Sequence, residues 1–251
     1  MRKMRVVAII QARMGSTRLS GKVLMPLKNI PMLEHIVRRV SRSEKLTDVV
    51  VATSTEEADD VVWEFCERRK IPCYRGSQNN VLERYYEAAR LYEADVVVRL
   101  TADNPFVDAE VIDEAIIYYL GKRKLDYLSY RKGLPLGVSV EVFSYYALQR
   151  AYDMTNNPEC LEHVTLFMYR NPKLFVCEKH DCIGRDYSNY RLTVDTEDDY
   201  RLAQVIYNQL YCKSREFSYH DVIRLLNENQ DMLQCNCDVR QKEQQYKGEE
   251  P

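Results

Sequence analysis

Near the start of the chain, cationic, hydroxyl and glycine residues are concentrated within residues 11–22. The cations are Arg13, Arg18 and Lys22, and two glycines allow the backbone to turn tightly and expose its N–H groups. A concave set of amide groups beside Arg and Lys side chains is suited to a polyphosphate. The segment is neither a Walker loop nor a G-x-G-x-x-G loop, because both spacings are absent. Since it directly follows a predicted buried strand, we favour a polyphosphate site over a solvated basic loop.

Two aspartates follow predicted strands further along the chain. Asp103 comes after the apolar run at residues 95–100, and Asp195 comes after residues 190–194. Either carboxylate alone could simply cap the helix that follows it. Together, at neighbouring strand ends, they offer two hard oxygen ligands, and Mg²⁺ bound to phosphates typically takes one or two protein carboxylates. Two carboxylates facing a basic loop therefore indicate a metal–triphosphate site.

Alternating strands and helices are predicted to position these residues. Strands are expected over residues 5–10, 48–52, 72–75, 95–100, 138–143, 174–178 and 190–194, and helices over residues 31–42, 56–69, 80–92, 108–120 and 197–210. Asn29 is expected to cap the first of these helices, with Pro31 in its first turn. This rhythm is typical of a doubly wound, mostly parallel α/β sheet. Ligands bind such sheets at the carboxyl ends of the strands, where the basic loop and both aspartates fall.

The alternation breaks after residue 127, and the segment from about residue 133 to residue 178 is predicted to form a small inserted arm. Its two strands are separated by a helical stretch that starts near Pro158. The segment is rich in the aromatic and Met residues that are enriched in the cores of protein interfaces, namely Tyr145, Tyr146, Phe167, Met168, Tyr169 and Phe175. We therefore expect it to serve dimerisation, the alternative being that it completes the central sheet.

The chain is expected to form one α/β domain over residues 1–229. The remaining residues, 230–251, are rich in Gln, Lys and Glu in their second half. Few apolar side chains are available there to offset the entropy lost on ordering the backbone. We therefore predict a poorly ordered C-terminal tail.

Composition excludes several broad classes of protein. The 251 residues include 36 basic and 38 acidic side chains, which give a formal net charge of −2. Nucleic-acid-binding domains usually carry a clear basic excess, so no nucleic-acid partner is expected. The apolar run behind the N-terminus is too short for a signal peptide, and no run reaches membrane-spanning length. We expect a cytoplasmic protein, without membrane insertion, whose eight cysteines are reduced thiols.

Eight short motifs follow one another along most of the chain. They are Met14-Gly-Ser-Thr-Arg-Leu-Ser-Gly-Lys-Val-Leu24, Val51-Ala-Thr-Ser54, Arg75-Gly-Ser77, Val81-Leu-Glu-Arg-Tyr85, Arg99-Leu-Thr-Ala-Asp-Asn-Pro105, Gly137-Val-Ser-Val-Glu-Val142, Glu162-His-Val-Thr165 and Leu192-Thr-Val-Asp-Thr196. In this order they resemble the cytidylyltransferases that activate acidic sugars, which include the octulosonate (Kdo) and acylneuraminate enzymes. The most similar branch is named for spore-coat polysaccharide biosynthesis. The resemblance covers about residues 5–210 and implies a Rossmann-like fold, CTP as donor, Mg²⁺ as cofactor and usually a homodimer.

The resemblance also implies roles for individual positions. It puts the phosphate-binding loop at Ala12, Arg13, Gly15, Ser16, Arg18 and Lys22, the other nucleotide contacts at Arg75, Ser77 and Thr101, and the metal carboxylates at Asp103 and Asp195. Catalytic roles are expected for Arg13, Lys22, Asp103 and Asp195. The implied reaction is attack of an acceptor oxygen on the α-phosphorus of CTP, with pyrophosphate leaving. The chain departs from the family pattern at Ser20, Asn29 and Glu197, and none of these changes removes a charge that the reaction needs.

Recognition of a sugar-type acceptor is predicted to involve Glu141 and His163. Glu141 lies on an alternating, largely apolar strand, where a carboxylate is costly to bury without a partner. Glu162 and His163 are expected to lie at the start of a helix, from which they could contact Glu141. An interface salt bridge at Glu141 is an equally open alternative.

Two other functions compete with the transferase. A glycosyltransferase that uses a nucleotide-sugar donor would also combine acidic metal ligands with a Rossmann-like sheet. Sugar transfer, however, requires fewer cationic contacts to a triphosphate than the basic loop provides. A non-catalytic nucleotide-binding protein of a glycan pathway has less need for Asp103 and Asp195 together with Lys22. We therefore favour a Mg²⁺-dependent cytidylyltransferase of surface-glycan biosynthesis.

Overall fold

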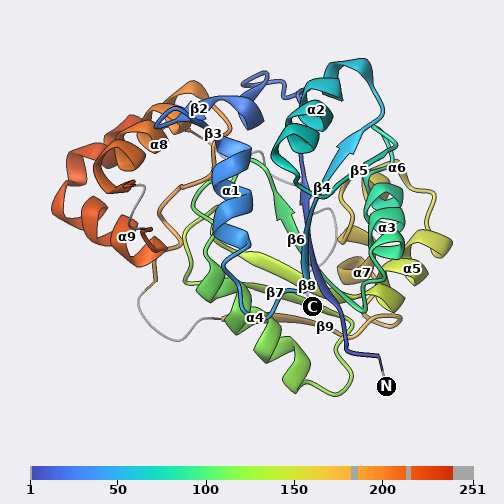
Figure 1. Cartoon of the computed structure of the whole chain (residues 1–251). Coiled ribbons are helices and arrows are strands. Elements are labelled where there is room, and N and C mark those ends of the chain that lie inside the picture. Colours follow the sequence, from blue (N-terminus) through green and yellow to red (C-terminus); the bar gives the residue numbers. More distant parts are fainter. Residues whose placement is uncertain (1, 182–185, 213–215, 240–251) are drawn as a thin grey trace.

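The computed structural model of the chain describes residues 2–181, 186–212 and 216–239 (Figure 1). A seven-stranded sheet forms its centre. Across the sheet the strands are ordered β5 (Cys73–Gly76), β4 (Asp48–Ser54), β1 (Val6–Gln11), β6 (Val96–Thr101), β8 (Val140–Ser144), β7 (Tyr127–Lys132) and β9 (Cys177–Asp181). The first four run parallel, β8 is antiparallel to both of its neighbours, and β9 is parallel to β7. The predicted mostly parallel α/β sheet is confirmed.

Helices pack on both faces of this sheet (Figure 1). One face is covered by α1 (Met32–Val40), α2 (Asp60–Arg69), α4 (Ala109–Gly121), α8 (Glu197–Leu210) and α9 (Tyr219–Glu228). The other is covered by α3 (Val81–Leu91), α5 (Tyr145–Met154), α6 (Pro158–Glu162) and α7 (Leu166–Arg170). Short 3₁₀ helices are formed by Lys22–Leu24, Glu57–Asp59 and Gln230–Cys235.

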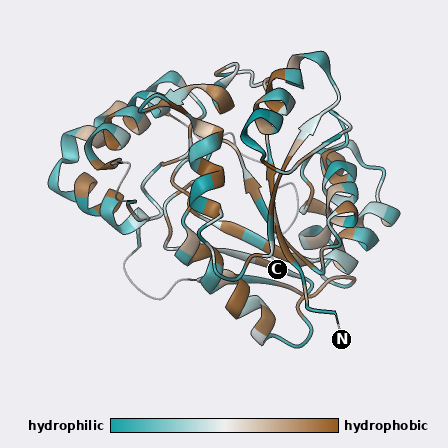
Figure 2. Cartoon of the chain, in the orientation of Figure 1, coloured by the Kyte–Doolittle hydropathy of each residue, from teal (hydrophilic) through white to brown (hydrophobic). Residues whose placement is uncertain are grey.

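Two hydrophobic cores result, one on each side of the sheet. Along β1 the side chains alternate between them: Ala8 and Ile10 pack beneath α1 and α4, whereas Val7 and Ile9 pack beneath α3. Hydrophobic residues accordingly line the strands and the helix faces turned toward them (Figure 2). The apolar run predicted to be central is β6, the fourth of the seven strands. None of the described helices is long and apolar enough to span a membrane.

The strand predicted at residues 190–194 does not form. This segment makes a single bridge, between Leu136 and Arg191. The Leu192 amide donates to the Leu136 carbonyl at 2.8 Å, and the Val194 amide donates to the Asp103 carbonyl at 2.8 Å. Because its hydrogen bonds go to two different segments, the stretch is extended and buried but has no continuous neighbouring strand.

The expected cap of the first helix is also wrong. Asn29 and Lys28 both have positive φ, 64° and 51°, and form the turn of a hairpin between β2 (Pro26–Leu27) and β3 (Ile30–Pro31). Asn tolerates this left-handed conformation better than most residues do, and two such residues in succession suit a tight hairpin. Pro31 is the N-cap residue of α1 and makes no side-chain capping bond.

The segment of residues 133–178 is built into the sheet. β8 lies between β6 and β7, and α5 packs against α3 on the sheet's face. The alternative that the segment completes the central sheet therefore describes β8 and the start of β9, which begins at Cys177. β7, α5 and α9 were not predicted from the sequence.

The part of the predicted tail that the structure describes, residues 230–239, is folded. After the 3₁₀ helix Gln230–Cys235, Asn236 is buried and its side chain donates to the Arg191 carbonyl at 3.1 Å and to the Asp199 carboxylate at 3.0 Å. Poor order is therefore the wrong expectation for residues 230–239. Residues 240–251 lie outside the described part of the chain.

We predict that Gly137→Ala destabilises the protein by about 2 kcal/mol or more. Gly137 has φ 99°, and a Cβ added there would lie 2.8 Å from the Thr193 amide nitrogen, a backbone atom that cannot move aside cheaply. Gly121→Ala is the matched control, because a Cβ there meets no atom within 4 Å. Urea unfolding followed by circular dichroism measures both. Equal midpoints for the two variants would contradict the close approach.

Candidate active site

The basic loop of residues 11–22 is held by its own backbone. The Ser16 and Gly21 amides both donate to the Met14 carbonyl, at 2.8 and 3.0 Å. Gly21 has φ 69° and precedes the 3₁₀ helix that begins at Lys22. Glycine adopts this left-handed conformation at little cost, so the loop can reverse just before the lysine. The Met14 amide donates to Asp59 at 2.6 Å, which ties the loop to the start of α2.

Lys22 lies at the centre of the site. Its ammonium donates to Asp195 at 2.8 Å, to the Val194 carbonyl at 2.8 Å and to Asp103 at 3.1 Å. The residue is 7% exposed, so these three acceptors replace the water that an ammonium otherwise needs. The predicted convergence of Asp103 and Asp195 on the basic loop is therefore found in the structure.

Asp195 is surrounded by cations. Its second carboxylate oxygen lies 3.0 Å from Arg18 and 2.9 Å from Arg191. Burial alone would raise the pKa of Asp195, but Lys22 and the two arginines outweigh it and lower the pKa. The carboxylate therefore stays ionised at neutral pH.

Asp103 is held more loosely. The Thr101 hydroxyl donates to its Oδ1 atom at 2.5 Å, and the side-chain amide of Asn104 donates to the same hydroxyl at 2.9 Å. Its side chain is 27% exposed, compared with 12% for Asp195. Thr101 thus orients the carboxylate that faces solvent more openly.

Glu141 forms a polar cluster in the sheet beside this site. It pairs with Arg99, its register partner across β6 and β8, and accepts from the Tyr127 hydroxyl. Thr165 donates to both carboxylate oxygens, at 3.2 and 3.4 Å. Burial acts to raise the pKa of Glu141, but Arg99 and the hydroxyls of Tyr127 and Thr165 together outweigh it, so the net shift is downward. The ion pair is thus made within one chain.

His163 does not open a helix, contrary to the prediction. Asn157 caps α6 by accepting from the Glu159 amide at 2.9 Å, so the helix begins at Pro158 and ends at Glu162. His163 is its half-buried C-cap residue. Thr165, two residues after His163, is among the described hydrogen-bond partners of Glu141. Glu162 instead comes within 4.0 Å of Arg13, which brings α6 to the basic loop.

Arg75 and Ser77 make contacts within the protein. Arg75 pairs with Asp60 at 2.6 Å and donates to the carbonyls of Ser54 and Glu56. The Ser77 hydroxyl accepts from the Asn80 amide at 3.0 Å, in the turn that leads into α3. Arg75 thus ties β5 to the segment between β4 and α2, whereas Ser77 shapes the loop after β5. Ala12 is buried and its amide donates to the Ala52 carbonyl, whereas Gly15 is exposed, with open space where a Cβ would be.

Sequence reasoning missed the residues that hold the carboxylates in place. Arg191 binds both Asp195 and Asp199, at 2.9 and 2.8 Å, and Asp199 closes a capping box with Thr196 at the start of α8. A Thr and an Asp three residues apart before a helix are a readable capping signal. No local sequence signal marks Arg191, because its pairing with Asp195 and Asp199 depends on the tertiary path of residues 190–194.

The arrangement fits a divalent cation bound together with phosphates. One ammonium, that of Lys22, reaches both Asp103 and Asp195, so a single cation can contact both carboxylates. Carboxylate oxygens are the hard ligands that Mg²⁺ prefers, and phosphates and water complete its shell. Within the described residues no group of three or more His, Cys, Asp or Glu side chains could hold a metal ion by itself. A metal here would depend on the phosphates of a ligand.

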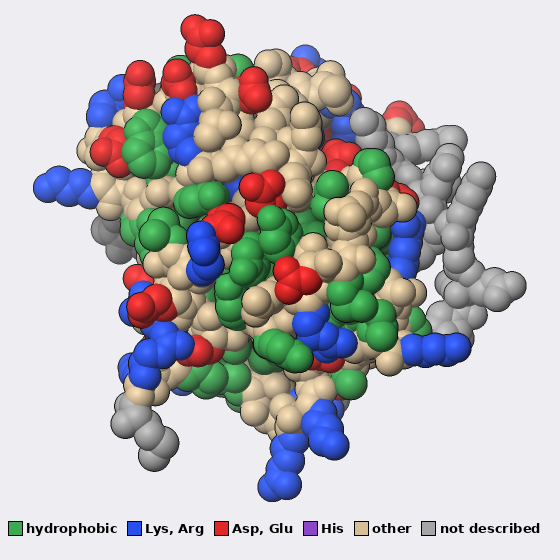
Figure 3. Space-filling view, turned by 90° about the vertical axis from the view of Figure 1, so that its right-hand side faces the viewer, with side chains coloured by type: hydrophobic (Ala, Val, Ile, Leu, Met, Phe, Trp, Pro, Cys, Tyr) green, Lys and Arg blue, Asp and Glu red, His purple; other side chains and the backbone are tan. Residues whose placement is uncertain are grey.

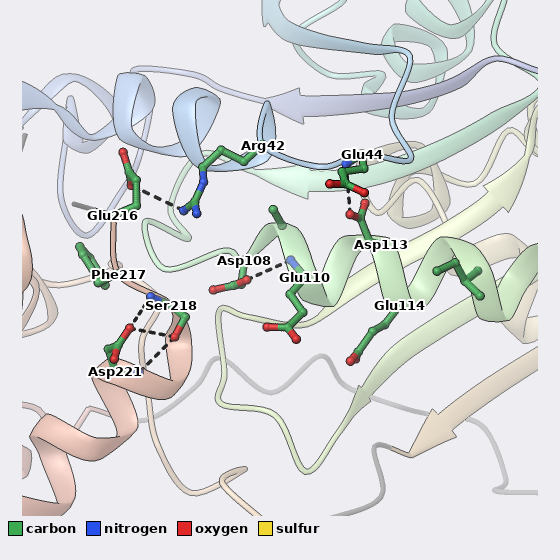
Figure 4. Close-up of a pocket in the computed structure, with 12 residues that line it drawn as sticks. Arg42, Glu44, Asp108, Glu110, Asp113, Glu114, Glu216, Phe217, Ser218 and Asp221 are labelled. Atoms are coloured by element: carbon green, nitrogen blue, oxygen red, sulfur yellow. Dashed lines mark hydrogen bonds and ion pairs between the residues drawn. The ribbon is translucent and has the colours of Figure 1, made fainter. Parts of the chain in front are cut away.

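A second concave region lies away from this site, between the end of α1 and the starts of α4 and α9 (Figure 4). It is a cavity of about 470 Å³ with many acidic residues in its wall. Asp108 and Asp221 close helix N-termini, and Asp113 accepts from the Glu44 and Lys45 amides. Since these carboxylates have structural partners, we assign the cavity no ligand.

Residues 7–246 match a family model described as cytidylyltransferase. The chain is 36% identical to the spore coat polysaccharide biosynthesis protein SpsF of Bacillus subtilis, over 90% of this chain and 95% of that protein. It is 32% identical to a cytidylyltransferase structure from Leptospira borgpetersenii, with a TM-score of 0.86 over 92% of this chain and 97% of that one. A CMP:2-keto-3-deoxy-manno-octonic acid synthetase complexed with CTP shares the fold, at 16% identity and a TM-score of 0.64 over 82% of this chain and 99% of that one.

We predict that Asp195→Asn lowers the free energy of unfolding by about 2–4 kcal/mol at pH 7, because it removes a buried counter-charge shared by Lys22, Arg18 and Arg191. The pKa of Asp195 is lowered in the folded state, so its contribution is complete above its unfolded pKa of about 4 and is lost as the pH falls through the lowered value. The difference between wild type and variant should therefore shrink in acid.

The matched control is Asp198→Asn, at the same helix start. Asp198 is half-exposed and pairs with Arg201 at 3.3 Å, so we expect a loss of less than about 1 kcal/mol. Urea titrations at pH 7 and pH 3 measure all three proteins. A pH-independent difference for Asp195→Asn would contradict the ion-pair account.

Proposed function

Since the chain belongs to the cytidylyltransferase family, and is therefore a nucleotidyltransferase, we propose that it transfers CMP from CTP to a sugar or sugar-acid acceptor and releases pyrophosphate. The observation that carries this proposal is the Lys22 ammonium held between Asp103 and Asp195 at the end of a basic loop. This grouping combines charges for a triphosphate with ligands for its metal.

Catalysis of this transfer consists mainly of positioning and charge neutralisation. Arg13 and Arg18 extend from the loop and would bind the phosphate oxygens, and Lys22 would stabilise the charge that develops on the leaving pyrophosphate. Asp103 and Asp195 would hold Mg²⁺. When bound, Mg²⁺ would polarise the α-phosphate and lower the pKa of an acceptor hydroxyl. The depressed pKa of Asp195 keeps that carboxylate ready to accept a cation.

The acceptor is proposed to bind beside the Glu141 cluster. The name of SpsF places that relative in polysaccharide biosynthesis, which supports a sugar-type acceptor for this chain as well. Glu141 and Arg99 offer an acceptor and a donor of hydrogen bonds, the pairing that sugar hydroxyls need. His163, on the nearby end of α6, is proposed as a further contact.

Pyrophosphate release tests the proposal. We expect CTP, among the four ribonucleoside triphosphates, to give release that requires both Mg²⁺ and an acceptor from a panel of sugar acids and phosphorylated sugars. Transfer of a sugar from a nucleotide-sugar donor, without pyrophosphate release, would overturn it in favour of a glycosyltransferase. Binding of CTP without turnover on any acceptor would point to a non-catalytic protein.

Lys22→Met tests the role of the loop lysine in turnover, and its melting temperature shows how far the fold is affected. We expect turnover to fall by about 10²-fold or more, since one donor to transition-state charge is typically worth this much. Lys45→Met, which removes an exposed lysine from the α1–β4 loop, is the matched control and should keep full turnover. Unchanged turnover in Lys22→Met would refute the assignment of the loop.

A homodimer is also proposed, formed through the face that carries α5 and the start of β9 (Figure 3). Hydrophobic side chains gather over the middle of this face. Four large exposed ones belong to residues 133–178: Tyr146, Met154, Leu174 and Val176, between 41% and 65% exposed. Exposed apolar groups of this kind, when clustered, mark interaction sites.

We predict a mass of twice 29.6 kDa in light scattering at micromolar concentration, and a monomer for Tyr146→Glu. A charge in an apolar interface is costly to bury, whereas the same charge on a free surface is not. Ile117→Glu on α4, 57% exposed and outside the segment, is the control and should remain dimeric. A wild-type mass of 29.6 kDa would rule out the dimer.

A further inference from the structure

Arg84, on the first turns of α3, is a buried cation without a carboxylate partner among the described residues. It is 1% exposed and is among the largest fully buried side chains. One hydrogen bond is recorded for its guanidinium, from Nη1 to the Ser77 carbonyl at 3.2 Å, and its buried Nε–H has no acceptor. A guanidinium has five N–H donors, so most of its bonding capacity is unused.

Such a side chain destabilises the free protein. A buried charge is tolerated when a counter-charge and hydrogen bonds replace its hydration, and a well-packed apolar side chain in its place is often neutral or stabilising. Here burial lowers the pKa of Arg84, and the charge of Arg13 lowers it further. Asp59 is the carboxylate that acts in the opposite direction on the pKa of Arg84, and it is already engaged by the Met14 amide and the Ser54 hydroxyl.

Arg84 lies beneath the end of the sheet where the nucleotide is proposed to bind. Its aliphatic stem packs under Gly76, where an added Cβ would approach Arg84 Cγ to 3.3 Å. The next residue, Tyr85, donates to the carbonyls of Ile9 and Leu100, at 3.2 and 2.9 Å, close to the ends of β1 and β6. The Arg84 guanidinium thus reaches the loop after β5 through the Ser77 carbonyl, and it lies close enough to Arg13 of the basic loop for the two charges to repel.

We propose that Arg84 is a buried electrostatic anchor for the nucleotide, and that its uncompensated charge is neutralised when the phosphate chain binds the basic loop. The inference rests on the proposed function, because it takes a nucleoside triphosphate to be the ligand. The anion does not need to touch Arg84. Charges interact strongly across a protein interior from which water is excluded, so a cation beneath the loop adds to its affinity for polyanions.

A charge series of ligands tests the anchor. Isothermal titration calorimetry would compare cytidine, CMP and CTP, without metal, on wild type and on Arg84→Met, which keeps a long apolar stem. We expect CTP to bind on the order of tenfold more weakly to the variant, CMP to lose less, and cytidine to be unaffected. Arg84→Lys, which keeps the charge, should retain most of the CTP affinity. Arg90→Met removes an exposed charge from the same helix and should bind all three ligands as wild type does.

The melting temperature of the free protein is the second readout. It should be unchanged or higher in Arg84→Met, because an unpaired buried charge has been removed. Loss of folding, or a lower melting temperature with unchanged CTP affinity, would overturn the proposal and make Arg84 a structural residue. An equal loss for cytidine and CTP would also overturn it, since Arg84 would then act on the nucleoside through Ser77. Failure of wild type to bind CTP would instead refute the proposed function.

Discussion

The contact between the Lys22 ammonium and the carboxylates of Asp103 and Asp195 is the interaction on which the rest of the site depends. It joins three segments that are far apart in sequence: the loop after β1, the loop after β6 and the approach to α8. A cation buried to this degree is stable only where its acceptors are fixed beforehand. The parallel pairing of β1 and β6 and the passage of residues 190–194 beside Asp103 supply that fixed geometry.

The site's cations divide into two groups. Lys22 and Arg191 are satisfied by carboxylates of the same chain, and they keep Asp195 ionised and in place. Arg13 is half-exposed and meets Glu162 only at 4.0 Å, so its charge is weakly compensated, and Arg84 beneath the loop is compensated less still. The first group holds the architecture of the site, whereas the second leaves a positive potential on the side where a polyphosphate is proposed to bind.

The elements that were predicted well are those whose signals are local. β1, β6, α3, α4 and α8 each combine an apolar period with a readable cap or strand run, and they form within one or two residues of the expected bounds. Two of the failures depended on distant partners. Residues 190–194 look like a strand but divide their hydrogen bonds between Leu136 and Asp103, and polar Asn236 is ordered because it bonds Arg191 and Asp199.

By itself the sequence determined the fold class, the family and the chemistry-bearing types of residue, because hydrophobic periodicity, a basic glycine-containing loop and ordered motifs are all properties of short segments. Only the tertiary structure decided which of these residues meet. It brought Lys22 between the two aspartates, paired Arg191 with Asp195 and Asp199, and enclosed Glu141 with Arg99 in place of His163. The physical reason is that hydrogen bonds and ion pairs act over about 3 Å, whereas their partners here are separated by tens of residues, so strand order and register determine them.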